Sequence, residues 1–383
     1  MNTKKRLIIL GATGSVGTTI LEEIARFQEH FEVVGISCHS NVERVETIIK
    51  NFSVQTIAVT DPKIPVPQNF CEKIFRGIDG LSAMLESLEF DVVVVAITGV
   101  DGLKPVLRAI ERGKIIVLAS KEVLVIAGEM VMNLAKTKGA TILPLDSEHN
   151  AIFQCTRGDN RFIKRLWLTA SGGIFWNKDF QAIENATVTE VLQHPKWSMG
   201  KKITVDSSTM ANKGLEIIEA MHLFEVESTQ IEVAVHPACI VHSLVEFCDG
   251  SFLAQLSPVS MKYAARHCLF YPERVDAQEA SLDLFQLGEL RFFRPDLEKF
   301  PCLKLAMEVA KRKQSTHIAY NAANEVAVAL FLKGKIALGA IPRIIAGVLS
   351  KMEEKNYATF EEILAVDQMA RSRAEQFAKK FYE

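Results

Sequence analysis

Two acidic residues stand two positions apart in residues 145–150, directly after a short apolar run. Carboxylate oxygens are the ligands that Mg²⁺ and Mn²⁺ prefer, so Asp146 and Glu148 could share one divalent cation. If the strand continued through them, its period of two would point both side chains to the same side. His149 would suit zinc, but no second His or Cys stands at a zinc-ligand spacing. A solvated acidic turn is the alternative reading of so short a motif.

A third carboxylate and a phosphate site are predicted within residues 206–216. The Asp, Ser and Thr at the start of this segment are good N-cap residues, which predicts a helix running from there towards Met221. Asn212 and Glu216 are four residues apart and would share a helix face, with Lys213 three residues from Glu216. A serine-rich helix start beside a lysine suits a phosphate, and Glu216 could complete the cation site. The alternative is a capped surface helix with an ordinary Lys–Glu pair.

Two further segments have the composition of ligand-binding loops. Residues 171–173 read Ser-Gly-Gly after an apolar run, and their backbone N–H groups could bind an anion. Residues 194–200 combine Pro, Gly, Trp and Met, which suits a lid that closes over a ligand. A surface turn held by a buried Trp is the alternative for the second segment.

Glycines recur at every third position as Gly11, Gly14 and Gly17, between an apolar run and a helical pattern. Glycine allows a tight turn and the close approach of a pyrophosphate to a helix N-terminus, so this loop predicts a dinucleotide site. A glycine turn that only packs is the alternative. The next strand ends at residues 36–41 without the acid that NAD sites place there, which favours NADP, and Arg44 is the nearest basic residue.

The elements that must position these groups alternate along the first 146 residues. Short apolar runs, typical of buried parallel strands, are separated by segments with helical spacing such as Val16, Ile20 and Ile24. This order predicts a doubly wound, Rossmann-like α/β domain with right-handed crossovers. The predicted strands cover residues 7–10, 32–37, 56–59, 91–97, 115–119 and 141–145.

The pattern changes after Asp146. Residues 231–235 alternate as in a half-buried strand, and an Asp-Gly turn joins the runs 240–247 and 251–256 as a hairpin. We therefore expect an α+β middle region with an antiparallel sheet, followed by a linker and a helical C-terminal region. The predicted division is an NADPH-binding domain at 1–146, a catalytic domain at 147–271, a linker at 272–302 and a helical domain at 303–383.

Composition limits the class of protein. The 383 residues include 44 basic and 46 acidic side chains, a net charge of −2, which argues against a dedicated nucleic-acid binder. Apolar residues make up 48% of the chain, as in globular proteins, and no uncharged apolar run is long enough for a membrane span. Seven scattered cysteines without a C-x-x-C pair predict reduced thiols and a cytoplasmic location.

Taken together and in this order, the motifs resemble those of the 1-deoxy-D-xylulose 5-phosphate reductoisomerase family along almost the whole chain. The resemblance also rests on residues 118–122, 236–237 with His242, 301–307 and 321–325. It implies a homodimer that uses NADPH, one divalent cation (Mg²⁺ or Mn²⁺) and a small sugar phosphate substrate, with no nucleic-acid or membrane partner. Ser120 and His39 differ from the residues common in the family at these positions.

The resemblance further implies a role for each matching position. The cofactor would contact Thr13, Gly14, Ser15, Val16, Ser40, Asn41, Ser120, Glu122 and Gly200. The divalent cation would bind Asp146, Glu148 and Glu216. The substrate would contact Lys121, Ser147, Glu148, Ser171, His194, Ser207, Asn212, Lys213 and Glu216, under a flap containing Trp197 and Met199. Catalysis would fall to Lys121, Ser147, Glu148 and Glu216.

The implied reaction has two stages and belongs to isoprenoid precursor biosynthesis. 1-Deoxy-D-xylulose 5-phosphate would rearrange to a branched aldehyde by carbon–carbon cleavage and rejoining, and NADPH would reduce the aldehyde to 2-C-methyl-D-erythritol 4-phosphate. Glu148, Lys121 and a metal-bound water are the candidates for moving protons. Another NADP-dependent oxidoreductase, such as a semialdehyde or homoserine dehydrogenase, would not need the acidic cation site. A redox sensor would bind NADP without turnover.

Overall fold

The computed structural model describes residues 4–67, 70–193, 200–279 and 281–382. The chain divides into two compact units, and each is described by itself. Unit 1 comprises Met1–Val123, Glu129–Asn150 and Met261–Ala277, and unit 2 comprises Leu124–Gly128, Ala151–Ser260 and Gln278–Glu383. The four-part division expected from the sequence stays a prediction.

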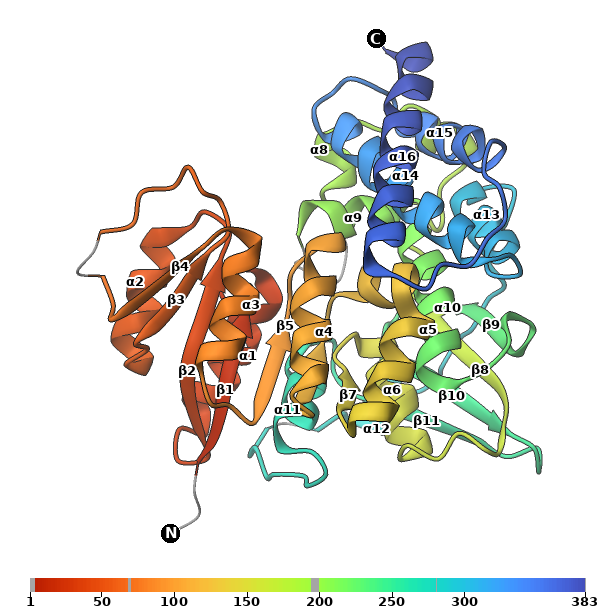
Figure 1. Ribbon diagram of the computed structural model, residues 1–383. Helices are drawn as coiled ribbons and strands as arrows, with labels where there is room; N and C mark the ends of the chain where they lie inside the picture. Colours follow the sequence, from red (N-terminus) through yellow and green to blue (C-terminus); the bar gives the residue numbers. More distant parts are fainter. Residues whose placement is uncertain (1–3, 68–69, 194–199, 280, 383) are drawn as a thin grey trace. The chain divides into compact units, whose positions relative to one another are not determined.

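Unit 1 is built on a seven-stranded sheet whose strands all run parallel, in the order β4-β3-β2-β1-β5-β6-β7 (Figure 1). The four valines of β5 are all buried, as a strand covered on both faces requires. The strands are β1 (Lys5–Leu10), β2 (Phe31–Cys38), β3 (Thr56–Val59), β4 (Lys73–Arg76), β5 (Val92–Val95), β6 (Ile115–Leu118) and β7 (Thr141–Pro144). This sheet confirms the Rossmann-like α/β class.

Only β4 among these strands is absent from the sequence prediction. It is a four-residue edge strand whose terminal residues, Lys73 and Arg76, are exposed, so it lacks the continuous apolar run of the central strands. Edge strands often carry charges of this kind, which hinder pairing with other chains.

Helices separate these parallel strands except β3 and β4, and a helix from much later in the sequence joins unit 1. This helix, α11 (Lys262–Phe270), packs against α1, where Arg266 forms an ion pair of 2.7 Å with the buried Glu23. The other helices are α1 (Ser15–Arg26), α2 (Val42–Phe52), α3 (Gly77–Ser87) and α4 (Leu103–Glu111). α5 (Lys121–Lys138) and α6 (Ser147–Thr156) belong partly to unit 1 and partly to unit 2.

Unit 2 contains a four-stranded sheet in the order β11-β10-β8-β9. The expected hairpin is present, with β10 antiparallel to both β11 and β8. However, β9 pairs with β8 in parallel, so the sheet is mixed and the expectation of an antiparallel sheet is wrong at this strand. In the described part of this connection, four α-helices lie between β8 and β9, which is long enough for the chain to return in the same direction. The strands are β8 (Ile163–Ala170), β9 (Ile231–Val235), β10 (Val241–Phe247) and β11 (Phe252–Leu256).

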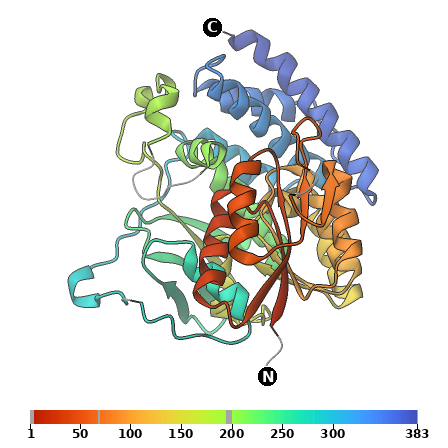
Figure 2. The ribbon, with the colours of Figure 1, turned by 90° about the vertical axis from the view of Figure 1, so that its left-hand side faces the viewer.

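The C-terminal part of unit 2 is helical, as expected. The helices α14, α15 and α16 pack against one another, and α16 is the long blue helix near the C-terminus in Figure 2. The helices of unit 2 are α7 (Phe180–Glu184), α8 (Val188–Val191), α9 (Lys201–Ser208), α10 (Ala211–Phe224), α12 (Leu284–Leu287), α13 (Pro301–Val309), α14 (Gln314–Leu332), α15 (Ala340–Leu349) and α16 (Phe360–Ala378).

The segment that carries α12 is extended and largely exposed. It appears in cyan in Figure 2, standing out from the rest of unit 2. A single antiparallel bridge joins its Phe293 to Val235 at the end of β9. Phe285 on α12 is fully exposed, at 100% of its reference area.

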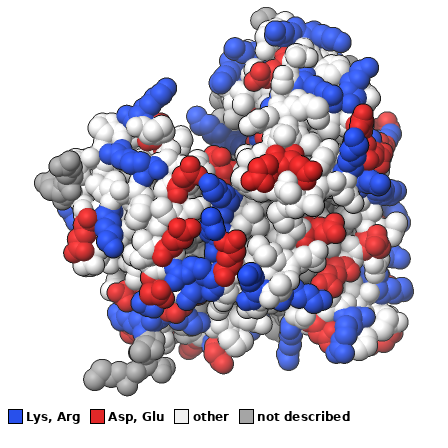
Figure 3. Space-filling model, in the orientation of Figure 1, with Lys and Arg blue, Asp and Glu red and all other residues white. Residues whose placement is uncertain are grey.

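Charged side chains of both signs are interspersed over the face drawn in Figure 3. Among the described residues, the longest helices are too polar to traverse a bilayer and the apolar ones are too short. The cytoplasmic location expected from the sequence stays a prediction.

Candidate active site

The glycine-rich loop joins β1 to α1, and close backbone contacts explain its spacing. Gly11 has a φ of +87°, and a Cβ there would lie 2.3 Å from the carbonyl oxygen of Ala96. A Cβ on Gly17 would lie 2.3 Å from the carbonyl oxygen of Gly11. Gly14 is the exposed N-cap of α1, where backbone N–H groups and the helix dipole favour an anion. The residues predicted to contact a pyrophosphate all lie at this helix end: Thr13, Gly14, Ser15 and Val16.

The carboxyl end of β2 leads into the residues predicted to lie near the adenosine 2′-phosphate. Ser40 and Asn41 are exposed, and the Asn41 side chain caps α2 by accepting a 3.1 Å hydrogen bond from the backbone N of Arg44. The Arg44 guanidinium donates to Oγ1 of Thr18 on α1 at 2.6 Å. Arg44 therefore reaches over to the helix that follows the glycine loop, a direction that the sequence could not give.

Ser120 shapes the turn between β6 and α5. Its hydroxyl accepts a hydrogen bond from the backbone N of Ile97 at 3.1 Å and lies 3.2 Å from the carbonyl oxygen of Val95. Ser120 is buried at the N-cap of α5, and Lys121 and Glu122 in the first turn are buried as well. A contact of Ser120 or Glu122 with the cofactor stays a prediction.

Lys121 and Asp146 form a close ion pair in unit 1. The Lys121 Nζ lies 2.5 Å from Oδ2 of Asp146, and both side chains are largely shielded from solvent. Burial alone would raise the pKa of Asp146, but the charge of Lys121 and a hydrogen bond with His149 outweigh it and hold that pKa well below its usual range. Asp146 is therefore an anion at neutral pH and is ready to act as a ligand.

Asp146 and Glu148 come together through a helix rather than through a strand. α6 begins at Ser147, so the alternation expected for a continuing strand is wrong here. Asp146 starts the helix, because its Oδ1 accepts from the backbone N of Ser147 at 3.0 Å and its carbonyl oxygen accepts from the backbone N of Asn150 at 2.8 Å. The Ser147 hydroxyl donates to Oε2 of Glu148 at 2.5 Å.

The structure brings together the three predicted metal-binding carboxylates. One oxygen from each of Asp146, Glu148 and Glu216 lies within 4.8 Å of the others. Glu216 is fully buried on α10, and its two oxygens accept hydrogen bonds from Asn212 and Lys213. A set of oxygen donors from three carboxylates fits a hard divalent cation such as Mg²⁺ or Mn²⁺.

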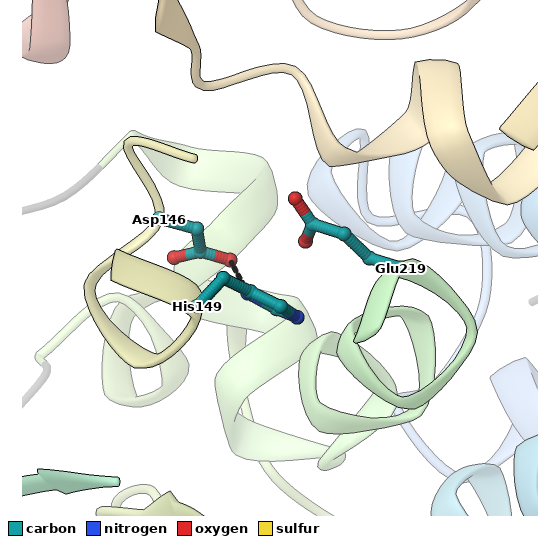
Figure 4. A group of neighbouring side chains, drawn as sticks. All are labelled: Asp146, His149 and Glu219. Atoms are coloured by element: carbon teal, nitrogen blue, oxygen red, sulfur yellow. Dashed lines mark ion pairs between the residues drawn. The ribbon is translucent and has the colours of Figure 1, made fainter. Parts of the chain in front are cut away.

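Asp146 belongs to a second group as well, with His149 and Glu219 (Figure 4). His149 Nδ1 lies 3.6 Å from Oδ2 of Asp146, one helical turn earlier. Glu219 is buried on α10, one turn after Glu216. The sequence argues against His149 as a zinc ligand, and the prediction missed Glu219. The spacing of three residues from Glu216 is the signal that could have found it.

The two segments that carry the predicted phosphate ligands Ser171 and Ser207 are in contact within unit 2. The backbone N of Gly173 donates to Oγ of Ser171 at 3.1 Å, in the loop after β8. A Cβ on Gly173 would lie 2.6 Å from the carbonyl oxygen of Ser207, so only glycine permits this approach. The Ser171 loop and the end of α9 are therefore in backbone contact.

The single helix expected from residue 206 onward is wrong, because the segment contains parts of two helices. α9 ends at Ser208, and Met210, with a φ of +57°, separates it from the start of α10. Asp206 thus lies in the last turn of α9 rather than at an N-cap. Its ion pair with Lys202, four residues earlier, stabilises the helix at this position. Asn212 and Lys213 do lie in the first turn of α10.

Part of the predicted flap lies outside the described residues. This applies to His194, Trp197 and Met199. Gly200 is described, and it is the exposed N-cap of α9. His242 is buried on β10, with its Nε2 2.9 Å from Oγ of Ser257.

Family models match most of the chain. The model for 1-deoxy-D-xylulose 5-phosphate reductoisomerase matches residues 7–128, the model for its C-terminal domain matches residues 142–224, and a DXP reductoisomerase C-terminal domain matches residues 256–373. A 1-deoxy-D-xylulose 5-phosphate reductoisomerase of Desulfosudis oleivorans is 45% identical, covering 97% of this chain and 98% of its own length. One from Psychrobacter sp. (strain PRwf-1) is 43% identical with the same coverage.

Solved structures agree with this result. A crystal structure of DOX-P reductoisomerase in complex with NADPH, fosmidomycin and magnesium is 42% identical to this chain, covers 98% of both chains and has a TM-score of 0.92. The Zymomonas mobilis enzyme in complex with NADPH is 35% identical, covers 98% of this chain and 99% of its own, and has a TM-score of 0.88. The likeness in sequence and fold runs from end to end and confirms the resemblance read from the motifs. The chain belongs to the 1-deoxy-D-xylulose 5-phosphate reductoisomerase family.

Proposed function

We propose that this chain is an NADPH- and divalent-metal-dependent enzyme that rearranges 1-deoxy-D-xylulose 5-phosphate and reduces it to 2-C-methyl-D-erythritol 4-phosphate, in isoprenoid precursor biosynthesis. The observation that carries this proposal is the carboxylate cluster of Asp146, Glu148 and Glu216, in a chain of the reductoisomerase family. Other NADP-dependent oxidoreductases of similar layout have no need of such a cluster.

The cofactor site is assigned to the glycine loop and the ends of the strands beside it. Bound NADPH supplies the hydride for the reduction. The N-terminus of α1 would hold its pyrophosphate. Ser40 and Asn41 offer neutral hydrogen-bonding groups at the end of β2, and Arg44 reaches towards the same helix. Residues 36–41, at this end of β2, include no Asp or Glu of the kind that NAD sites place there, which supports NADPH over NADH.

The three carboxylates would hold one Mg²⁺ or Mn²⁺. A cation there supplies Lewis acidity, which stabilises negative charge that develops on a substrate oxygen. Lys121 keeps Asp146 ionised and therefore available as a ligand at neutral pH. Lys121, Glu148 and a metal-bound water are the candidates for holding or moving a proton at the reacting end of the sugar.

The substrate phosphate would bind the loop after β8 and the residues around the turn between α9 and α10. Ser171 and Ser207 offer hydroxyl groups, Asn212 offers an amide and Lys213 offers a positive charge. Binding a phosphate that is remote from the reacting carbons orients those carbons without changing them, which is an effective use of binding energy. Lys213 is buried beside Glu216, so the proposed phosphate and metal sites would both use residues of α10.

The direct test is an NADPH-oxidation assay with 1-deoxy-D-xylulose 5-phosphate, with and without EDTA. We expect substrate-dependent oxidation that EDTA abolishes and that added Mg²⁺ or Mn²⁺ restores, with a branched polyol phosphate as the product. Oxidation that EDTA leaves unchanged would favour a metal-independent oxidoreductase. Cofactor binding without any turnover would favour a sensor.

We further propose that the chain forms a homodimer through unit 2. β11 is an edge strand, and its Phe252 and Leu253 are each 51% exposed. Leu284 and Phe285 on α12 are exposed as well, at 65% and 100%. Exposed apolar residues on an unpaired strand edge are costly in a monomer and typical of an interface. Sedimentation equilibrium should give a dimer, and a monomer at micromolar concentration would contradict this proposal.

A further inference from the structure

A buried carboxylate to which the proposed reaction gives no task lies on α9. Asp206 is 1% exposed, and its Oδ2 accepts a 2.8 Å hydrogen bond from the Nζ of Lys202 on the same helix. Its Oδ1 accepts a 2.7 Å hydrogen bond from Nδ2 of Asn324, which lies on α14, 118 residues later in the chain. A buried carboxylate persists only where such partners compensate its lost hydration. Asp206 therefore ties α9 to α14.

The end of α9 that Asp206 holds carries a predicted phosphate ligand, Ser207. On its other side, the loop of Ser171 packs against it through Gly173, where a Cβ would lie 2.6 Å from the carbonyl oxygen of Ser207 and 3.1 Å from Cα of Ser208. The backbone at Ser207 is thus held from two directions. Loss of the Asp206–Asn324 hydrogen bond would remove one of the two restraints.

The same helix, α14, also supports the start of α10. Tyr320 lies one turn before Asn324 and donates a 3.0 Å hydrogen bond to the carbonyl oxygen of Cys302. A Cβ on Gly214, the residue after Lys213, would lie 3.0 Å from the Tyr320 hydroxyl oxygen. Residues four apart share one helix face, so one face of α14 backs both segments that carry predicted phosphate ligands.

We propose that Asp206 and Asn324 are positioning residues for the phosphate site of the substrate. Asn324 acts through Asp206, and Asp206 acts through Ser207, which follows it directly. The C-terminal helical region thereby sets the affinity for the sugar phosphate without contacting it. This inference rests on the proposed function, because that function supplies the phosphorylated substrate.

The test compares the steady-state kinetics of Asp206→Ala and Asn324→Leu with those of the wild-type enzyme. We expect KM for 1-deoxy-D-xylulose 5-phosphate to rise about tenfold or more in each variant, with kcat within about threefold and KM for NADPH unchanged. Asp206→Asn keeps an oxygen that can accept from Asn324, so its KM should stay within about threefold of the wild-type value. Asn324→Leu keeps the branching and the number of side-chain heavy atoms, and it decides the matter if Asp206→Ala does not fold.

Ser315→Ala is the matched control. It removes two other hydrogen bonds of a buried side chain on α14. The Ser315 Oγ donates to the carbonyl oxygen of Glu353 at 2.8 Å and accepts from the backbone N of Lys355 at 2.9 Å, about 13 Å along the helix from Asn324. Its KM for the sugar phosphate should match the wild type. An unchanged KM in folded Asn324→Leu, an equal rise in the control, or a parallel rise in KM for NADPH would overturn the inference. A wild-type enzyme that does not turn over the substrate would instead overturn the proposed function.

Discussion

Lysine side chains balance two of the three clustered carboxylates. Lys121 Nζ lies 2.5 Å from Asp146, and Lys213 donates to Glu216 within the first turns of α10. A lysine is a compact charge on a flexible stem, so it can support a buried acid and also meet an anion. Lys213, in the first turn of α10, is also the predicted positively charged ligand of the substrate phosphate.

Replacement of Lys213 by Ala tests this role. A hydrogen bond to a charged group contributes about 1.5–3 kcal/mol, so KM for the sugar phosphate should rise roughly 10- to 100-fold. Steady-state kinetics measure the rise, with Lys304→Ala as the control because Lys304 forms an exposed ion pair with Glu298 at 2.6 Å. An unchanged KM would remove Lys213 from the phosphate site.

Arg44 gives a second test, on the cofactor side. A guanidinium near a 2′-phosphate favours NADPH and has no partner on NADH. In Arg44→Leu we expect KM for NADPH to rise about tenfold while KM for NADH stays within about twofold. Lys50→Ala, in the last turn of the same helix, is the control and should change neither value. Equal changes for both cofactors would show that Arg44 does not read the phosphate.

At the scale of elements, periodic patterns in the sequence predict those strands whose position depends on burial and on local turns. The central parallel strands appear in the sequence as apolar runs, and the hairpin of β10 and β11 follows from its Asp-Gly turn. The break at Met210 could not be predicted, because a methionine with positive φ leaves no signature in the sequence. The parallel pairing of β9 depends on the path of distant helices, and local alternation says nothing of direction.

The site shows the same contrast. The spacing of Asp146 and Glu148 is enough to predict that they belong to one group of carboxylates. The prediction assumes that they lie on a strand, whereas α6 begins at Ser147. Arg44 was visible in the sequence, but its direction depends on the packing of α2 against β2. The partnership of Asp206 with Asn324 joins segments 118 residues apart and has no local signal at all.

Because α14 buries His317, we expect the free energy of unfolding to depend on pH. Burial, reinforced by the nearby His222, lowers the pKa of His317 from 6.5 to about 4, and its Nε2 lies 3.1 Å from the carbonyl oxygen of Val309. Because the unfolded chain takes up this proton first as pH falls, stability is lost between about pH 6.5 and pH 4, by up to about 3 kcal/mol. Urea unfolding should show that the free energy of unfolding falls less between about pH 6.5 and pH 4 in His317→Gln than in the wild type. His30→Gln, at an exposed site, should follow the wild type, and parallel curves for all three proteins would contradict the assignment.

At the scale of the whole molecule, the account depends on carboxylates from separate parts of the chain acting as one ligand set. Asp146 and Glu148 follow the last strand of the parallel sheet, whereas Glu216 belongs to a helix that begins much later. This chain and its relatives match over nearly their full lengths, so both halves of the ligand set lie in the part that matches the family. The reaction then requires that the cation and NADPH bind the same molecule.

Binding of Mn²⁺, followed by electron paramagnetic resonance with NADPH present, tests this ligand set most directly. Wild-type protein should bind one Mn²⁺ per chain, and Glu216→Gln should bind it at least about tenfold more weakly while its affinity for NADPH stays the same. Turnover of 1-deoxy-D-xylulose 5-phosphate by that variant should fall by about 100-fold or more. Wild-type Mn²⁺ affinity in Glu216→Gln, or an equal loss of NADPH binding, would contradict the account.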